Sequence, residues 1–229
     1  MKTIKVKIDE ITRLNKFLSA SGVVSRRNAD DLIKNGLVTI NDRIAVLGDK
    51  VNNGDTISFK KIETPLTYAL YYKPRGEITG RIPDLKGCEP VGRLDKESEG
   101  LLLYTNDYRV VDAVLHPIHA REKEYEVKVR EKTTPRVITL LKKGIKTQET
   151  TYSPVKSVQI YGEGHSIRIV ITEGKKHEIR RMLNALNLTV LSLKRVRIMS
   201  FVSHGLKAGV PHILSQKQKD TLMKDCGIE

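Results

Sequence analysis

Four apolar stretches with the patterns of β-strands occupy the chain between residues 68 and 171. Residues 68–72 and 101–104 are continuous apolar runs, which are typical of strands covered on both faces. At 125–129 and 167–171, apolar residues alternate with polar ones, as in strands that bury only one face. These patterns predict a large sheet, and the sheet constrains how the rest of the chain can fold.

Helical patterns occur twice in the same part of the chain. Pro135–Lys143 begins with proline, which suits the first turn of a helix, and Gly144 follows it, which suits the end. Residues 175–186 carry an apolar stripe at helical spacing, formed by Ile179, Met182, Leu183 and Leu186. Residues 188–202 are again rich in strand formers. The predicted fold class is therefore α+β, with a mostly antiparallel mixed sheet in the larger part.

The first 60 residues have a different pattern. Apolar residues at helical spacing over 14–18 precede Gly22, which can end a helix in a left-handed conformation. Ser25 is a favourable N-cap for a second helix over 26–35. Short strand-like stretches then follow at 37–40, 43–47 and 56–59. This order predicts two helices packed on a small β-hairpin structure.

The change of pattern divides the chain into two expected domains. The small domain covers residues 1–60, the larger domain covers 67–229, and residues 61–66 form a linker between them. The connection reads KKIETPL and shows no apolar periodicity. We therefore expect the small domain to move on this linker.

The charge of the chain indicates a polyanionic partner. The formal net charge is +14 and the pI is about 9.7. A compact monomer with this charge repels itself, which favours a nucleic-acid partner over a merely basic protein. Arg26 and Arg27 lie in the first turn of a predicted helix, where the helix dipole disfavours cations. Most charged helix faces are simply solvated, but this placement indicates a phosphate partner.

Composition also indicates which cellular compartment and which cofactors to expect. The two cysteines, Cys88 and Cys226, lie far apart, which fits free thiols in a reducing compartment. No apolar run approaches the roughly 18 residues of a membrane span, and the first residues lack a secretory signal. We expect a cytoplasmic protein without a membrane partner. His116 and His119 lack the close paired spacing of zinc sites, so no metal is expected.

The densest group of reactive side chains lies in the sequence VGRLDKESEGLLLYTND, residues 91–107. Asp95 stands in a turn directly before a buried apolar strand, and Arg93 is close to it. Burial and a nearby cation can tune a carboxylate for chemistry. A turn aspartate that accepts hydrogen bonds from backbone amides would give the same pattern. The residues alone leave both interpretations open and favour the second.

The small domain resembles the S4 RNA-binding domain. The resemblance covers residues 13–57, and the runs SRRNAD, IKNGLVTIN and VNNGDTI carry it. S4 domains bind structured RNA, commonly ribosomal RNA, through their two helices. The RNA contacts that the resemblance implies are Arg13, Lys16, Ser25, Arg26 and Arg27.

The larger domain resembles the pseudouridine synthases, specifically the RsuA/RluB/RluE/RluF branch that acts on ribosomal RNA. The sequence GRLDKESEGLLLYTND looks like the catalytic signature of these enzymes. Four further elements match in order: TYALYYKPRGEIT, REKEYEV, TEGKKHEIRRML and LKRVRIMSF. GRLDKESEG, REKEY and RVRIM lean towards the RluF-like members that act on large-subunit RNA. The departures are Tyr104, Tyr108 and Glu178, which remove no catalytic group but bear on which RNA site is chosen.

The resemblance implies a role for each matching residue. Asp95 would be the catalytic aspartate, Tyr125 would pack on the target base, and Arg180 would pair with the aspartate. Arg93 would hold the opened RNA helix. Further RNA contacts are expected at Lys123, Lys176, His177 and Arg181. Without the resemblance, Tyr125 would be interpreted as one more apolar residue on the inner face of a strand. On a helix, Arg180 would flank the buried stripe and Arg181 would face solvent.

The implied activity is the isomerisation of a uridine to pseudouridine in ribosomal RNA, with the large subunit slightly favoured. No cofactor or metal is expected. The partner would be ribosomal RNA or a ribosome assembly intermediate, and we expect a monomer because the basic surface resists self-association. A non-catalytic RNA-binding or assembly protein with the same fold is the main alternative. The presence of Asp95, Tyr125 and Arg180 together favours the enzyme.

Overall fold

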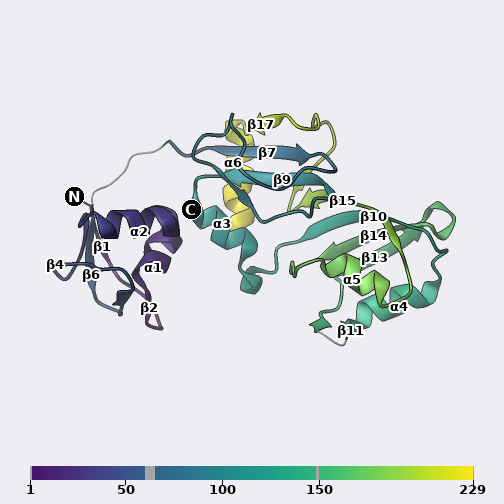
Figure 1. Cartoon of the computed structure of the whole chain (residues 1–229), viewed down its shortest axis with the longest axis horizontal. Coiled ribbons are helices and arrows are strands. Elements are labelled where there is room, and N and C mark those ends of the chain that lie inside the picture. The colour runs from purple at the N-terminus through teal and green to yellow at the C-terminus, as the bar shows by residue number, and fades with distance from the viewer. Residues whose placement is uncertain (1, 60–64, 148–149, 229) are drawn as a thin grey trace. The chain divides into compact units, whose positions relative to one another are not determined.

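The computed structural model describes residues 2–59, 65–147 and 150–228 and divides into two compact units (Figure 1). Unit 1 comprises Met1–Thr67 and Thr105–Asp112, and unit 2 comprises Tyr68–Tyr104 and Ala113–Glu229. Most of the expected linker, 61–64, lies outside the described residues. The α+β class and the combination of a small N-terminal domain with a larger sheet domain are confirmed.

Unit 1 packs two helices on a small antiparallel sheet. The helices are α1 (Leu14–Ala20) and α2 (Arg26–Lys34). The sheet has the order β1-β6-β3-β4, with strands at Lys2–Lys5, Thr56–Phe59, Val38–Ile40 and Arg43–Ile44. A separate two-stranded pair joins β2 (Thr12–Arg13) to β5 (Lys50–Val51). The sequence patterns missed β1, because its side chains are mostly exposed and polar and show no alternation.

Helix α2 begins where its sequence predicts. The hydroxyl oxygen of Ser25 accepts a hydrogen bond from the backbone amide of Asn28 at 2.9 Å, which caps the helix. The side chains of Ala29, Leu32 and Ile33 form its buried stripe. This stripe packs into the core of unit 1, and the charged residues of α2 remain outside.

Unit 2 is built on one sheet with the strand order β13-β14-β10-β15-β9-β7-β17, on which β8 and β16 pair at the side. In chain order these strands are β7 Tyr68–Lys73, β8 Glu89–Val91, β9 Glu99–Thr105, β10 Lys123–Val129, β13 Ser157–Tyr161, β14 Ser166–Ile171, β15 Val190–Ile198, β16 Phe201–Val202 and β17 Pro211–Ile213. Strand β10 is antiparallel to both β14 and β15, whereas β9 runs parallel to β15. The sheet is therefore mixed, as the patterns predict.

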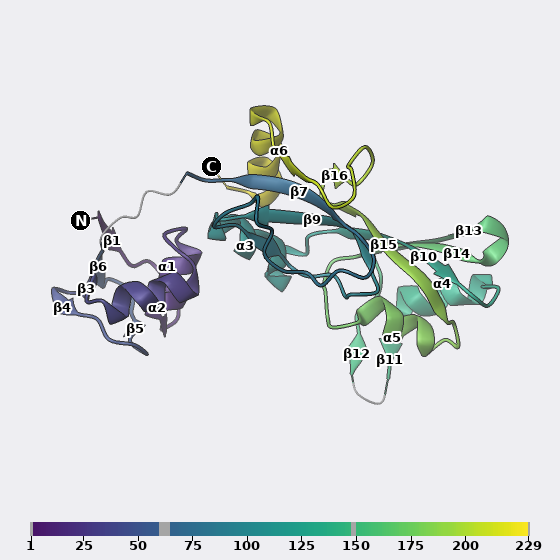
Figure 2. The same ribbon diagram turned by 45° about the horizontal axis from the view of Figure 1, so that its top comes forward.

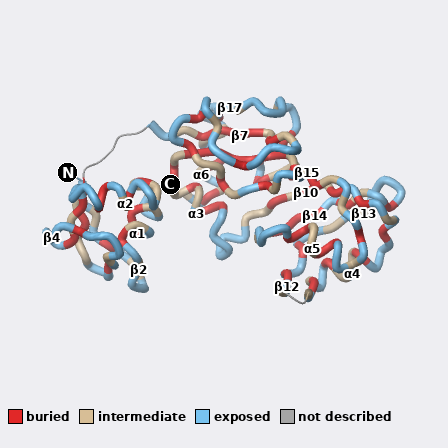
Figure 3. The backbone as a smooth tube through the Cα atoms, in the orientation of Figure 1, coloured by how far each residue is buried: buried red, intermediate tan, exposed pale blue. Residues whose placement is uncertain are grey.

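Helices cover this sheet, and burial is concentrated between the layers (Figure 3). In unit 2 they are α4 Pro135–Lys143, α5 Glu178–Asn184 and α6 Gln216–Cys226, with short 3-10 turns η1 Pro117–His119 and η2 Gly162–Gly164. Figure 2 shows α4 and α5 on the same side of β10 and β14. A small hairpin, β11 (Ile145–Lys146) with β12 (Thr151–Tyr152), lies between α4 and β13 in the sequence. The helix α3, Tyr108–Leu115, contributes to both units.

The helix predictions need two corrections. The helix expected over 175–186 begins only at Glu178, because His177 has a left-handed backbone with φ of 55°. Its apolar stripe is nevertheless buried as expected at Ile179, Met182 and Leu183. Helices α3 and α6 were not predicted. In the described part of the chain, no helix is long and apolar enough to cross a membrane.

Candidate active site

A cavity of about 940 Å³ opens in unit 2 between the turn that precedes β9 and the segment that leads into α5. Side chains of β10 and β15 also line it. Six of the expected site residues contribute to its wall: Arg93, Asp95, Lys123, Tyr125, Lys176 and His177. Because these residues come from three separate segments, the fold assembles the site.

Asp95 lies at the wall of this cavity with its carboxylate open to solvent. Its side chain is 35% exposed, and its Oδ1 lies 3.3 Å from Nε2 of His177. The amide of Ser98 donates to the backbone carbonyl of Asp95 at 3.0 Å, which closes the turn. Across the described ranges, no backbone amide donates to the carboxylate itself. The structure therefore does not show the backbone-bonded turn aspartate that the sequence left open.

Arg180 braces the same turn. Its Nη2 donates to the carbonyl oxygen of Glu97 at 3.1 Å and to the hydroxyl of Ser98 at 3.3 Å. Burial lowers the pKa of Arg180, and the negative charge of Asp95 opposes this effect. Both Arg180 and Asp95 lie in the described part of the chain, and no ion pair joins them directly. The residue that meets the carboxylate directly is His177.

Lys73 stabilises the turn around Asp95, although it was not among the expected site residues. This lysine ends β7 and is only 1% exposed. Its ammonium donates to the carbonyl oxygens of Pro74 at 2.8 Å, Glu77 at 2.7 Å and Lys96 at 3.4 Å. Burial lowers the pKa of Lys73, and nearby carboxylates including Glu77 and Asp95 oppose that effect. The sequence KPRG at residues 73–76, within the matched element TYALYYKPRGEIT, marked the position of Lys73 but not its burial.

Tyr125 forms part of the cavity floor on the inner face of β10. Its register partner on β15 is Arg195, whose Nη1 lies 3.4 Å from the Tyr125 hydroxyl oxygen. The Nε of Arg195 donates to the carbonyl oxygen of Leu101 on β9 at 2.7 Å. Arg195 therefore joins the two strands on either side of β15. In the sequence it stands among other basic residues, so nothing marked it as buried.

Lys123 was expected to contact RNA, but its amine faces the protein interior. The residue is 8% exposed, and its Nζ donates to the carbonyl oxygens of Arg121 at 3.2 Å and Val114 at 3.5 Å. Burial and the charge of Arg195 lower the pKa of Lys123 to about 8, although Glu178 opposes this shift. Burial raises the pKa of Glu178. All three of these buried residues contribute to the lining of the cavity.

The remaining expected residues of unit 2 differ in exposure. Arg93 and His177 are exposed and line the cavity, as does Lys176. Arg181 is half-buried rather than fully open to solvent, and it is not part of the cavity wall. The rings of His116 and His119 pack edge to face, with centroids 5.9 Å apart. No group of three potential metal-binding side chains occurs within the described ranges.

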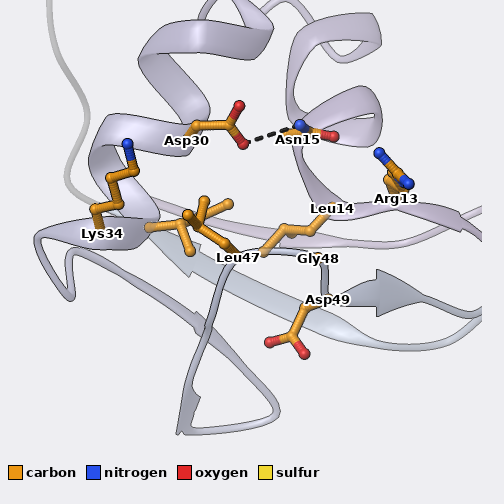
Figure 4. Close-up of a pocket in the computed structure, with 9 residues that line it drawn as sticks. Arg13, Leu14, Asn15, Asp30, Lys34, Leu47, Gly48 and Asp49 are labelled. Atoms are coloured by element: carbon orange, nitrogen blue, oxygen red, sulfur yellow. Dashed lines mark hydrogen bonds between the residues drawn. The ribbon is translucent and has the colours of Figure 1, made fainter.

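The expected RNA contacts of unit 1 lie on its two helices or directly before them. Arg13, Lys16, Arg26 and Arg27 are exposed, and Ser25 is half-buried as the cap of α2. Arg13 also borders a hollow of about 220 Å³, shown in Figure 4. There the amide of Asn15 donates to Asp30 at 2.9 Å, and Asp49 lies on the opposite side.

This hollow mixes charges of both signs. A hydrogen bond from the amide of Val46 lowers the pKa of Asp49, so its carboxylate stays charged at neutral pH. Two acidic side chains make the hollow a poor site for phosphate. The exposed arginines at the start of α2 remain the better candidates in unit 1.

Comparisons with known proteins agree with this arrangement. Residues 70–185 match the family model described as RNA pseudouridylate synthase, and residues 12–57 match the S4 domain. The chain is 34% identical over 220 residues to ribosomal large subunit pseudouridine synthase B of Bacillus subtilis (strain 168), covering 86% of this chain and 89% of that protein. It is 32% identical over 233 residues to an uncharacterized RNA pseudouridine synthase of Borreliella burgdorferi, covering 92% of each.

A solved structure shows the same fold. It is a crystal structure of a pseudouridylate synthase, which superposes with a TM-score of 0.69 at 26% identity and covers 92% of this chain and 99% of that one. The relatives named here include synthase B, so the lean towards RluF-like members gains no support from them. The chain belongs to the RNA pseudouridylate synthase family and carries an N-terminal S4 domain.

Proposed function

We propose that this protein isomerises a uridine of large-subunit ribosomal RNA to pseudouridine, with Asp95 as the catalytic carboxylate. One observation carries the proposal: Asp95, Tyr125 and Arg93 line a single cavity. The named relatives, which include ribosomal large subunit pseudouridine synthases, support the choice of RNA. Cytoplasmic location and a monomeric state belong to the same proposal.

The reaction needs an ionised carboxylate beside a base that has left its stack. The base loses its N1–C1′ bond and is rejoined to the sugar through C5. Asp95 has one solvent-exposed face from which it can act on the base or the sugar. Flipping the nucleotide costs a few kcal/mol, which stacking on Tyr125 would offset. Arg93, exposed at the wall, would fill the space that the base leaves.

Basic side chains around the site would hold the RNA backbone. Lys176 and His177 line the cavity and are exposed. Arg180 would act through the Asp95 turn, whose backbone and Ser98 hydroxyl it contacts. In unit 1, Arg26 and Arg27 would add phosphate contacts at the start of α2. The assignment of the small domain to 1–60, the linker to 61–66 and the catalytic domain to 67–229 stays part of the proposal.

The test compares ribosomal RNA from cells with and without the gene by carbodiimide labelling and primer extension. We expect one stop to disappear on deletion and to return with the wild-type gene but not with Asp95→Asn. Glu97→Gln is the matched control, because Glu97 lies two residues away with a side chain that is 60% exposed. It should restore the stop fully.

Two other results would contradict the proposal. Restoration by Asp95→Asn would exclude the catalytic assignment. An unchanged labelling pattern, with the protein still bound to ribosomal particles, would favour an RNA-binding protein without this activity. Asp95→Asn protein should still bind the RNA, since the substitution removes no cation.

A further inference from the structure

The floor of the cavity contains a buried hydrogen-bond donor that has no acceptor. Arg195 is 3% exposed, and its Nε and Nη1 have partners in Leu101 and Tyr125. Its Nη2 is buried, and among the described residues no acceptor lies within hydrogen-bonding distance. Buried donors without partners are rare in folded proteins, and a charged donor is the least favourable case.

The position of this donor relates it to the base. Arg195 and Tyr125 are register partners on neighbouring strands, and both line the cavity. A flat ring stacked on Tyr125 would therefore lie next to the guanidinium group. Of the groups that a pyrimidine presents, the carbonyl oxygens O2 and O4 can accept a hydrogen bond from it.

We propose that Arg195 recognises the target uracil by donating a hydrogen bond from Nη2 to one of its two carbonyl oxygens. This inference rests on the proposed function and adds a residue that contacts the reacting base. Nη2 is closed off in the free protein, so the hydrogen bond forms as the base enters and the covering side chains shift. Leu101 and Tyr125 hold the rest of the guanidinium in place meanwhile.

The hydrogen bond also affects the rate. When the N1–C1′ bond breaks, its electron pair remains on the base and is delocalised onto O2 and O4. C5 then bonds to C1′, the proton on C5 leaves, and N1 takes up a proton, so the atoms balance. A guanidinium donor on a carbonyl oxygen interacts more strongly with the electron-rich base than with neutral uridine. It therefore stabilises the transition state selectively.

The experiment combines substitutions of the enzyme with substitutions of single atoms in the substrate. Full-length protein converts an RNA fragment that carries the mapped uridine, or 2-thiouridine or 4-thiouridine at that position, in single turnovers. Sulfur is a weaker acceptor than oxygen. The enzymes are wild type, Arg195→Lys and Arg195→Met, with Arg168→Met as control. Arg168 is an exposed arginine of β14 that is not part of the cavity wall.

The expected result is coupling between the two substitutions. For each enzyme, the rate with uridine is divided by the rate with a thio substrate. For one of the two thio substrates, this ratio should be about tenfold larger in the wild type and in Arg168→Met than in the Arg195 variants. A purely structural role of Arg195 would lower all three rates by the same factor. Oxygen-to-sulfur effects that agree within twofold in wild type and in both Arg195 variants would overturn the proposal.

The wild type alone provides a second test, which applies if neither Arg195 variant folds. O2 and O4 lie on opposite sides of N3, so Nη2 can reach only one of them, and the rates with 2-thiouridine and 4-thiouridine must differ. Equal rates within twofold would overturn the proposal. If the wild type fails with uridine itself, the proposed function fails, which is a distinguishable outcome.

Discussion

Gly100 allows β9 and β15 to run side by side at the edge of the cavity, and an alanine there should disrupt this contact. Gly100 is the register partner of Arg195 in the parallel pair. A Cβ atom at Gly100 would lie 2.2 Å from the carbonyl oxygen and 2.7 Å from the amide nitrogen of Arg195. Both are backbone atoms of a central strand, so neither can move without shifting the sheet.

The magnitude follows from two separable effects. The φ of Gly100 is 114°, a region that residues other than glycine rarely adopt, and an alanine there costs about 1–3 kcal/mol. The backbone collision adds roughly 1–3 kcal/mol, the range for overpacking a filled interior. Gly205 provides the control, because its φ is 81° but a Cβ atom added there would meet no other atom within 4 Å. Gly205→Ala should show the first effect alone.

Thermal unfolding monitored by tyrosine fluorescence can measure the difference. The chain has eight tyrosines and no tryptophan, and all tyrosines except Tyr108 lie in unit 2. An additional destabilisation of about 2 kcal/mol corresponds to a midpoint roughly 4–8 °C lower for a chain of this length. Gly100→Ala should therefore unfold that much below Gly205→Ala. Midpoints within about 2 °C of each other would refute the argument that the close approach of β9 and β15 requires glycine.

Two further predictions concern charge and capping. The pKa of Lys123 in the folded protein is about 8, below its ordinary 10.5, so the unfolded chain binds more protons between these values and stability rises with pH. The free energy of unfolding of unit 2 should rise by about 1.5 kcal/mol from about pH 8 to 9.5 in denaturant titrations, and Lys123→Met should abolish this rise. If the variant shows the same pH dependence as the wild type, Lys123 is not the group responsible. Ser25→Ala removes the hydroxyl oxygen that accepts the hydrogen bond from the Asn28 amide, so α2 should be destabilised by about 1 kcal/mol. The amide hydrogens of α2 should then exchange faster with solvent. Ser21→Ala, at the exposed end of α1, should leave that exchange unchanged.

The sequence predicted those parts of the fold in which local pattern and tertiary packing agree. Pro135–Lys143 is a helix with the expected bounds, and the alternating stretch at 125–129 is a strand with its apolar face buried. Strand β1 was missed because its pairing with β6, rather than its own side chains, makes it a strand. The start of α5 was misplaced because the left-handed backbone at His177 depends on the surrounding structure.

The candidate site shows the same division. The turn around Asp95 was predictable because its residues are contiguous, and the alternation of apolar and polar residues over 125–129 placed Tyr125 on a strand. The burial of Lys123, Lys73 and Arg195 was not predictable. A lysine or arginine within a basic chain is almost always exposed, and only the packed sheet determines which few are not.

Because of this difference in burial, we expect the exposed and the buried cations of the cavity to have different roles. In the proposed function, an exposed side chain such as Lys176 lies in water, where salt screens its charge, so it would act as one of many contacts along the RNA backbone. Lys123 and Arg195 lie in the floor, where the lower dielectric strengthens the effect of one charge on one nearby atom. Substitutions at the wall should therefore change the affinity for RNA and its salt dependence. Substitution of Arg195 should change the rate of the bound complex, because its charge is the one proposed to act on the base itself.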